Sequence, residues 1–318
     1  MLKTVFIGAG RRAQSAHYPT VSRIENSKIS AVSELDESRM GEVVDKYNIP
    51  ETFGDYREMV ESVDPDIVYV VMGQEYMTQI AIDCMNAGKH IFIEKPAGGS
   101  PAESRQLLQA AESNNVICAV GYQRRFAAVT TETMRLIKEK GGPTLVVGEF
   151  HKDLLGTPKP PRTTMWDDIC HAVDLIRYVA GSEVSDTKAF QDTNGSDWPN
   201  DYTALMRFKN GANGVLLANR SSGGRTLRAE AHGIGIGCYI HIPDQIEIME
   251  SAKEARTVHG ANLFGDAIDD THAYDGTLEM HKHVTESIIN GQTPINDIRD
   301  VIHTSELVAL LEGNSAGE

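Results

Sequence analysis

A short apolar strand that runs straight into a glycine-rich turn constrains this chain most. Residues 4–7 read Thr-Val-Phe-Ile, and residues 8–13 read Gly-Ala-Gly-Arg-Arg-Ala. In such a turn one small residue closes the bend, a second admits a pyrophosphate, and a third lets helix and strand pack closely. The stretch predicts the start of a dinucleotide-binding βαβ unit, with cofactor contacts from Gly8, Gly10, Arg11, Arg12 and Ala13.

An acidic residue lies where the adenosine ribose of a dinucleotide would be held. Residues 29–33 predict a second strand, which ends at Glu34. A carboxylate about 20 residues after the fingerprint accepts hydrogen bonds from ribose hydroxyls. Because Leu35 follows, no basic side chain stands next to Glu34 for a 2′-phosphate. We therefore expect NAD as the cofactor, with NADP kept as an alternative because a guanidinium can reach a phosphate from Arg11, Arg12 or Arg39.

The rest of the first half alternates predicted strands with predicted helices. Strands are expected over residues 66–71, 91–93 and 116–121, and capping boxes or glycine caps mark the helices between them. Such alternation indicates a parallel sheet that is covered on both faces. The predicted fold class is α/β, beginning with a Rossmann dinucleotide-binding domain over residues 1–122.

The strand over residues 91–93 stops abruptly at Glu94-Lys95-Pro96. In an open parallel sheet the carboxyl end of a strand faces the ligand crevice, so Lys95 would be presented to a bound molecule. A lysine before a loop proline is by itself most often an ordinary surface residue. The remaining motifs decide between these two interpretations.

The pattern changes after Gly121. Between residues 183 and 259, short strands follow one another with turn signals such as Asn210-Gly211, which indicates a largely antiparallel sheet. Amphipathic helices are expected near residues 278–290 and 297–311. The predicted second domain, residues 123–318, is α+β with a large, open, mostly antiparallel sheet.

Three polar residues of the second half have helical spacing. Asp167, His171 and Asp174 stand at i, i+4 and i+7, which would place two carboxylates and an imidazole on one helix face. Such a helical pair is often only structural and contributes a few tenths of a kcal/mol. Together with Lys95 at a strand end, the pattern favours a catalytic site.

These motifs occur in an order that resembles one family. The set comprises the glycine fingerprint, Glu94-Lys95-Pro96, the segment 121–126, the Asp167-His171-Asp174 pattern and Gly291-Gln292-Thr293-Pro294. It is similar to the glucose-fructose oxidoreductase and inositol dehydrogenase family (Gfo/Idh/MocA) over nearly the whole chain. The resemblance implies an NAD(P)-dependent oxidoreductase that moves a hydride between a nicotinamide and a hydroxyl-bearing carbon of an inositol-like sugar or polyol.

The resemblance also implies roles for individual residues. Lys95, Asp167 and His171 would be catalytic: histidine suits a base near neutral pH, an ammonium stabilises a developing alkoxide, and a carboxylate orients the imidazole or a neighbouring hydroxyl. The expected substrate-binding residues are Lys95, Arg125, Trp166, Asp167 and His171. The expected cofactor contacts also include Met72, Gly73, Glu94, Lys95 and Gln123.

The chain departs from the family at two places. Residues 72–77 read Met-Gly-Gln-Glu-Tyr-Met where the family commonly has Thr-Pro-Asn-x-x-His, so Met77 replaces a histidine. Ile169 replaces the usual glycine two residues before the motif histidine. We expect an altered substrate rather than lost chemistry. Two alternatives stay open: a hydrolase or lyase that uses a retained NAD for transient oxidation, and a non-catalytic dinucleotide sensor.

Composition excludes several classes of partner. A net charge of −15 argues against nucleic acid and against an anionic membrane surface. No apolar run approaches the roughly 18 residues of a spanning helix, and no secretory signal precedes the first strand, so we expect a cytoplasmic protein. The four scattered cysteines predict buried free thiols. No metal site is expected, because His281 and His283 at i, i+2 do not face each other on a helix.

One predicted strand suggests self-association. Residues 204–208 carry apolar side chains on both faces, since Ala204, Met206 and Phe208 alternate with Leu205 and Arg207. We expect both faces to be covered, the outer one by another copy of the chain. The predicted assembly is a homodimer or a homotetramer.

Overall fold

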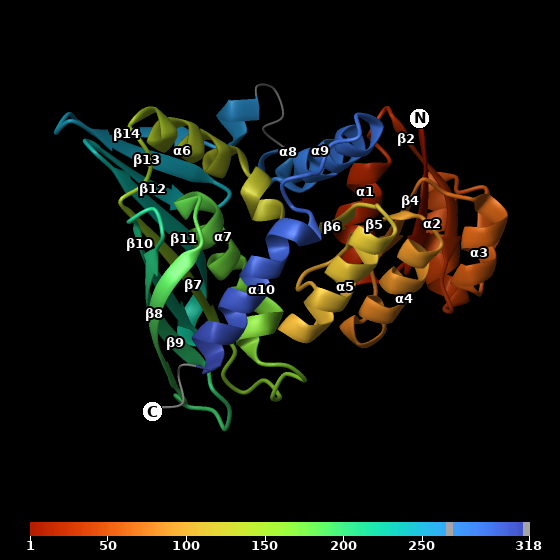
Figure 1. The fold of residues 1–318 in the computed structure, drawn as a ribbon, viewed down its shortest axis with the longest axis horizontal. Helices are drawn as coiled ribbons and strands as arrows, with labels where there is room; N and C mark the ends of the chain where they lie inside the picture. Colours follow the sequence, from red (N-terminus) through yellow and green to blue (C-terminus); the bar gives the residue numbers. More distant parts are fainter. Residues whose placement is uncertain (265–269, 314–318) are drawn as a thin grey trace. The chain divides into compact units, whose positions relative to one another are not determined.

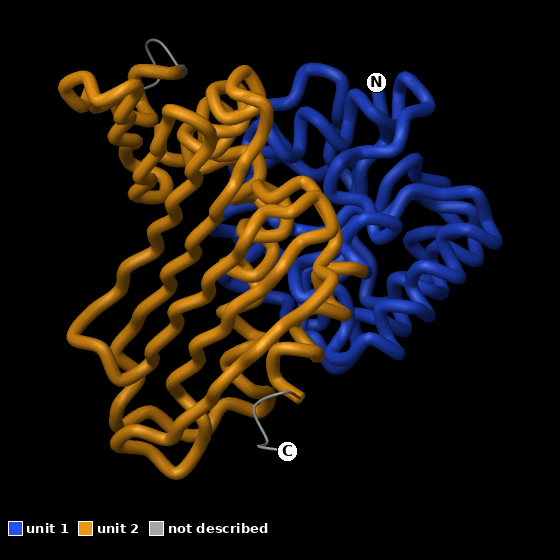
Figure 2. The backbone as a smooth tube through the Cα atoms, turned by 60° about the vertical axis from the view of Figure 1, so that its left-hand side comes forward, with its two compact units in different colours: residues 1–122, 277–302 blue, residues 123–276, 303–318 orange. Residues whose placement is uncertain are grey.

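The computed structural model describes residues 1–264 and 270–313, which form two compact units (Figure 2). The first unit comprises residues 1–122 and 277–302. The second comprises residues 123–276 and 303–318, of which 265–269 and 314–318 lie outside the described residues. The predicted boundary after residue 122 therefore coincides with the end of one segment, but the chain returns to the first unit later.

The described residues of the first unit form a six-stranded parallel sheet (Figure 1). Its order is β3-β2-β1-β4-β5-β6, and the direction of winding reverses between β1 and β4, where doubly wound sheets bind nucleotides. This confirms the predicted Rossmann architecture. The strands are β1 (Leu2–Ile7), β2 (Ser27–Ser33), β3 (Glu51–Phe53), β4 (Ile67–Val70), β5 (His90–Ile93) and β6 (Cys118–Val120).

Helices connect these strands and begin at the predicted caps. Ser100 accepts a hydrogen bond from the Glu103 N–H, with Pro101 in the first helical turn, and Asp55 accepts one from the Arg57 N–H. The glycine turn continues into a π-helical turn, η1 (Ala13–His17). The helices are α1 (Tyr18–Val21), α2 (Glu37–Tyr47), α3 (Tyr56–Val63), α4 (Gln74–Asn86) and α5 (Pro101–Ser113).

Stacked aromatic rings join the strands of the first unit. Phe6 on β1 lies between Tyr18 and Tyr69, with ring centroids 4.1 and 4.7 Å away, and Tyr69 stacks on Phe92 at 4.9 Å. All four side chains are buried. Each pair adds about 0.5–1.5 kcal/mol beyond the burial of its area. The stack fixes α1, and with it the preceding glycine turn, against β1, β4 and β5.

Residues 277–302 complete the first unit, although they were predicted in the second domain. This segment contains α9 (Thr277–Ile289) and the start of α10 (Ile298–Gly313). Asn296 exchanges two bonds with Val120, and a carboxylate oxygen of Asp297 accepts the Cys118 N–H at 3.0 Å. The prediction was wrong here because the segment covers the edge of β6, whose backbone groups would otherwise lack partners.

In the described part of the second unit, eight strands form one sheet of order β14-β13-β12-β11-β7-β10-β9-β8. Strands β7 and β10 run parallel, and the other neighbouring pairs are antiparallel. The predicted mostly antiparallel sheet is confirmed. The strands are β7 (Leu145–Asp153), β8 (Val184–Asp192), β9 (Asp201–Phe208), β10 (Asn213–Asn219), β11 (Ser221–Gly233), β12 (Ile236–His241), β13 (Gln245–Glu250) and β14 (Arg256–His259).

Helices α6 (Ala128–Glu139) and α7 (Cys170–Ala180) cover one face of this sheet (Figure 1). A Cβ at Gly148 would stand 2.7 Å from Ile176, so α7 lies directly on the backbone of β7. The other short elements are η2 (Gln123–Phe126), the π-helical turn η3 (Met165–Ile169), η4 (Ala261–Phe264) and α8 (Thr271–Tyr274). Across the described ranges, every helix is too short or too polar to cross a bilayer.

The outer face of the large sheet corrects one expectation. On β9, Ala204, Met206 and Phe208 are buried, whereas Leu205 is 54% exposed and Arg207 is exposed. Within this chain the strand is therefore covered on one face. Whether a second copy covers the other face stays a prediction.

A buried ion pair joins η2 to α7 in the second unit. Arg125 donates from Nε to Asp174 at 2.9 Å and from its terminal nitrogen to the other carboxylate oxygen, and both side chains are almost fully buried. Thr304 donates to the same carboxylate at 2.8 Å. The Arg125 guanidinium also lies 5.1 Å from the centre of the Tyr178 ring.

We predict that Asp174→Ala lowers the free energy of unfolding by about 3–5 kcal/mol, because Arg125 would remain as a buried charge without its carboxylate. Urea denaturation followed by circular dichroism measures this. As a control, Arg135→Ala removes exposed pairs with Glu132 and Glu139 and should cost less than about 1 kcal/mol. Equal losses of unfolding free energy in the two variants would show that the buried pair stabilises the protein no more than the surface pairs do.

Candidate functional site

The glycine turn after β1 has the shape that a pyrophosphate needs. Gly8 has φ +101°, and a Cβ there would stand 2.3 Å from the Val71 carbonyl oxygen, so a side chain cannot fit. A Cβ at Gly10 would meet only the end of Arg39, at 4.0 Å, which leaves the surface open. Ala13 is fully buried. The turn can therefore hold NAD, whose pyrophosphate would lie against open backbone at the start of the helix.

Glu34 lies beside this turn, as predicted. One of its carboxylate oxygens accepts the Ala9 N–H at 2.8 Å, and the other accepts the N–H groups of Leu35 and Asp36 at 2.9 and 3.0 Å. Arg39, on α2, is held by Asp36 at 3.0 Å. The carboxylate thus fixes the end of β2 to the fingerprint, and a guanidinium stands at the same edge.

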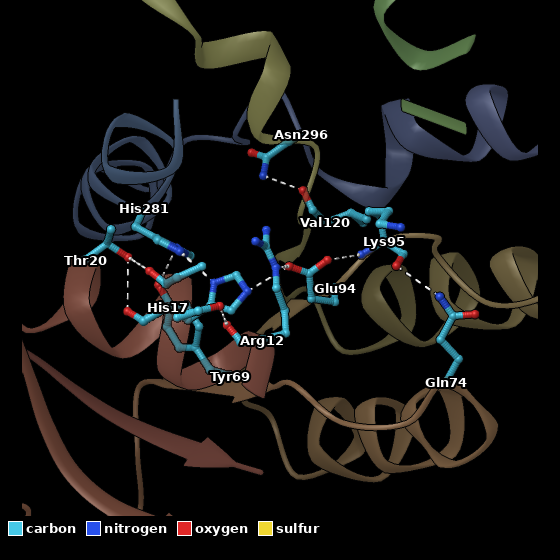
Figure 3. A network of polar contacts seen from close by, with 12 residues as sticks. Arg12, His17, Thr20, Tyr69, Gln74, Glu94, Lys95, Val120, His281 and Asn296 are labelled. Carbon is cyan, nitrogen blue, oxygen red and sulfur yellow. Dashed lines mark hydrogen bonds and ion pairs between the residues drawn. The ribbon is translucent and has the colours of Figure 1, made fainter. Parts of the chain in front are cut away.

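The backbone of Lys95 is held from both sides at the end of β5 (Figure 3). Its N–H donates to an oxygen of Glu94 at 3.1 Å, and its carbonyl accepts the Gln74 side-chain N–H at 3.0 Å. Gln74 begins α4 directly after Met72 and Gly73. Sequence reasoning did not select Gln74, although it occupies the position of the asparagine in the family's Thr-Pro-Asn run. Met77, which replaces the family's histidine, is fully buried.

Glu94 is the centre of a buried polar network (Figure 3). One oxygen accepts from Arg12 Nε and from His17 Nε2, each at 2.7 Å. Behind His17, Nδ1 lies 2.9 Å from His281 Nε2, and His281 Nδ1 lies 3.3 Å from the Tyr69 hydroxyl. Glu94 and Arg12 were predicted to contact the cofactor, but both Glu94 oxygens already accept bonds from protein groups. His17 was missed, and His281 was considered only as a metal ligand, because their pairing joins segments far apart in the sequence and leaves no periodic signal.

The surroundings of Glu94 decide its charge. Burial by itself raises the pKa of this carboxyl, but the hydrogen bonds and positive charges of His17 and Arg12 prevail and hold the pKa well below its usual range. The stabilisation from such a group is complete above its unfolded pKa and is lost only as pH falls through the depressed folded value. Glu94 is therefore an anion throughout the neutral range.

In the second unit, the three motif residues do not share one face. Asp167 is exposed and His171 is half-buried, whereas Asp174 is buried against Arg125. The π-helical turn η3 precedes α7 and changes the angular spacing of the residues before it. Asp167 and His171 therefore retain access to a ligand, and Asp174 does not.

Two side chains that were predicted to contact the substrate are bonded to other groups inside the second unit. Arg125 is fully buried and its guanidinium is bonded to Asp174. Trp166 is 6% exposed, and its indole N–H donates to Glu312 on α10 at 2.9 Å. Both side chains satisfy groups inside the second unit, so their polar atoms are committed. Contact of either side chain with a substrate stays a prediction, because motif residues that support a site and motif residues that contact a ligand look alike in a sequence.

A charged group beside Asp167 was not predicted. Asp168 pairs with Lys152 at 2.7 Å and with Arg220 at 3.1 Å. Arg220 is fully buried and lies 4.5 Å from the centre of the Phe150 ring. Ile169, the replacement for the family's glycine, is also fully buried. Among the residues that the structure describes, no three His, Cys, Asp or Glu side chains are grouped to hold a metal.

Two models of one family match this chain. The model described as oxidoreductase family, NAD-binding Rossmann fold, matches residues 2–122. The GFO/IDH/MocA C-terminal domain model matches residues 138–235. The order of the two matches is that of the two domains expected from the motifs.

Curated relatives carry dehydrogenase or oxidoreductase names. The uncharacterized oxidoreductase YrbE of Bacillus subtilis (strain 168) is 32% identical over 196 residues, 58% of this chain and 56% of that relative. This alignment spans little more than half of the relative's length. The scyllo-inositol 2-dehydrogenase (NAD(+)) of the same organism is 27% identical over 313 residues, 92% of this chain and 88% of the relative.

Solved structures have the same fold. A dehydrogenase from Chromobacterium violaceum has a TM-score of 0.89 at 17% identity and covers 99% of this chain and 96% of that chain. Levoglucosan dehydrogenase in complex with NADH and levoglucosan has a TM-score of 0.85 at 19% identity and covers 99% and 97%. With both domain models matched in order, the chain belongs to the Gfo/Idh/MocA family and is an NAD-dependent oxidoreductase.

Proposed function

We propose that this enzyme oxidises a hydroxyl-bearing carbon of an inositol-like sugar or polyol and delivers the hydride to NAD. The observation that carries the proposal is Lys95, whose backbone is held by Glu94 and Gln74 at the carboxyl end of β5. In a doubly wound sheet this edge holds the nucleotide. The name of the relative that aligns over 92% of the chain, scyllo-inositol 2-dehydrogenase (NAD(+)), supports a polyol substrate.

The chemistry divides among three side chains. Oxidation of an alcohol removes a hydride from carbon and a proton from oxygen. NAD, when bound, supplies the hydride acceptor. His171 takes the hydroxyl proton as a general base, since an imidazole titrates near neutral pH. The Lys95 ammonium stabilises the developing alkoxide, and the exposed Asp167 orients the imidazole or holds a neighbouring hydroxyl.

The replacements in the motifs support a substrate that differs from those of common family members. Ile169 puts a bulky side chain where the family has glycine, and Asp168, Lys152 and Arg220 bring charge beside Asp167. A polyhydroxylated ring offers several hydroxyls for such polar groups. The specific polyol is left to the substrate panel below.

The open face of the large sheet supports self-association into a homodimer or a homotetramer. Leu205, Val215 and Val147 are paired in register across β9, β10 and β7, which makes an apolar row on that face. We place the enzyme in the cytoplasm, since its four cysteines are buried and form no disulfide bond with one another, as a reducing compartment favours.

For self-association, we predict a dimeric or larger mass by light scattering at micromolar concentration. Leu205→Glu should shift the mass toward the monomer, because a charge would enter the apolar row. Leu310→Glu, at an exposed apolar residue on α10, introduces the same charge outside this row and serves as the control. A monomeric mass for the wild-type chain would contradict the proposal.

For the cofactor, we predict a higher kcat/KM with NAD than with NADP, by about tenfold or more, which corresponds to about 1.4 kcal/mol. The Glu34 carboxylate would repel a 2′-phosphate. Glu34→Gln keeps the size of the side chain and removes its charge. The ratio of kcat/KM with NAD to kcat/KM with NADP should therefore be smaller in this variant. A comparable or better kcat/KM with NADP in the wild-type enzyme would refute the preference.

For catalysis, we predict that Lys95→Ala and His171→Ala each reduce kcat by about 100- to 10,000-fold. NAD affinity should change little, because it resides mainly in the glycine turn and Glu34. Both residues serve one proton transfer, so the fold-reduction of kcat in the double variant should be far smaller than the product of the two single reductions. Nicotinamide absorbance and calorimetric NAD binding provide the two measurements.

The same assay, run over a panel of polyols with product detected separately, tests the reaction class. Near-normal turnover of His171→Ala from about pH 6 to about pH 9 would show that the base is misassigned. Product formation without net NADH would indicate the hydrolase or lyase alternative. NAD binding without any product would indicate the sensor.

A further inference from the structure

We propose that His17 and His281 are positioning residues for Lys95. The two imidazoles form a buried hydrogen-bonded chain that holds the Glu94 carboxylate, and Glu94 in turn holds the Lys95 backbone (Figure 3). The effect on turnover rests on the proposed function, in which Lys95 stabilises the alkoxide. The positioning itself is a property of the first unit and can be measured without turnover.

The Glu94 carboxylate determines which nitrogen of His17 is the donor. His17 Nε2 faces a carboxylate, so this nitrogen carries a proton and donates it. His17 Nδ1 can then accept from His281 Nε2, and His281 Nδ1 can accept from the Tyr69 hydroxyl. In this arrangement each donor of the series meets an acceptor. The orientation of the His17 ring is thus held from its second nitrogen by His281, from α9, a segment more than 250 residues later in the sequence.

The Glu94 carboxylate, at the end of this series of hydrogen bonds, has little freedom to move. Its first oxygen accepts from His17 and Arg12, and its second accepts the Lys95 N–H. On the other side, a Cβ at Gly121 would stand only 3.3 Å from that second oxygen, so any side chain at this position would crowd the carboxylate. A buried histidine is commonly just a satisfied core residue. Here its partner is bonded directly to the residue that the reaction uses.

Removal of the His17 donor should change how Glu94 titrates. Burial raises the pKa of Glu94, and His17 is the first of the groups that lower it, ahead of Arg12. The Arg12 side chain is 45% exposed, so solvent screens its charge. Without the His17 donor, Glu94 takes up a proton at a higher pH than in the wild-type enzyme, and the hold on Lys95 is lost as pH falls through that value. The titratable groups around this network are Arg12, His17, Tyr69, Lys95 and His281.

Two polar substitutions of His17 separate the effect of its hydrogen-bond donor from the effect of its side-chain volume. In His17→Gln, the side-chain N–H reaches about as far as Nε2 and can still donate to Glu94. In His17→Asn, the shorter amide can contact His281 but cannot reach Glu94. We expect kcat to fall about 10- to 100-fold in His17→Asn, with a new loss of activity toward acid pH, and the NAD Kd nearly unchanged. His17→Gln should retain most of the turnover and the wild-type pH profile.

A matched control comes from α1, which follows directly after His17. The Thr20 hydroxyl donates to the carbonyls of Ala16 and His17 and does not contact Glu94. Thr20→Val perturbs α1 as a buried, nearly isosteric change, and its pH profile should match that of the wild-type enzyme. An acidic loss in Thr20→Val as large as that in His17→Asn would overturn the proposal, because general destabilisation would explain both.

His281 is tested through His17. If His281 acts only by holding the His17 ring in orientation, then His281→Leu should reduce kcat on its own but add little to the loss in His17→Asn. A double variant that loses the product of the two single effects would show that His281 acts independently, and its positioning role would be refuted.

Hydrogen exchange of the Lys95 amide provides a readout that needs no substrate. This N–H donates to Glu94, so it should exchange faster in His17→Asn than in His17→Gln, Thr20→Val or the wild-type protein. Unchanged exchange in His17→Asn would overturn the positioning role, even in an active dehydrogenase. Faster exchange in a protein that oxidises no polyol would uphold the positioning role and refute the proposed function instead.

Discussion

The first unit depends on keeping one buried carboxylate charged. The removal of an ion such as Glu94 from water costs several kcal/mol, and the cost is offset only when donors surround the group in good geometry. Arg12, His17 and the Lys95 N–H provide those donors. Because they come from the glycine turn, the first helix and the end of β5, one charge requirement aligns the parts that a dinucleotide site needs. The aromatic stack of Phe6, Tyr18 and Tyr69 then supports that alignment from within the core.

The second unit also contains a buried carboxylate, and its ionic partner there is an arginine. Asp174 and Arg125 are buried together, and Thr304 completes the hydrogen bonds of the carboxylate. The pair fixes η2 to α7, and so sets where α7 presents His171. In both units, some charged motif residues are buried and hold neighbouring elements in place, as Glu94 does in the first unit. Arg125 and Asp174 do the same in the second unit.

Much of this fold could be predicted from local patterns. The alternation of apolar strands with capped helices was sufficient for a parallel sheet, and Ser100 with Pro101 marked the start of α5 correctly. The return of residues 277–302 could not be predicted, since the pairing of Asn296 with Val120 is a contact between distant segments that leaves no periodicity. For the same reason, the contact between His17 and His281 gave no signal. Their roles depend on what lies opposite them in space.

The two π-helical turns have a consequence for comparisons among relatives. Each of the turns at residues 13–17 and 165–169 accommodates one residue more than an ordinary α-helical turn. Loss of a single residue there would convert the turn into regular α-helix and rotate the preceding residues by about 100° relative to the rest of the helix. Family members that differ by one insertion at these points can therefore keep the same packing of α1 and α7 while presenting different side chains beside them. Residues on either side of these turns should be matched between relatives by their positions in space. A sequence alignment can be wrong by one residue there, because the turn can gain or lose one.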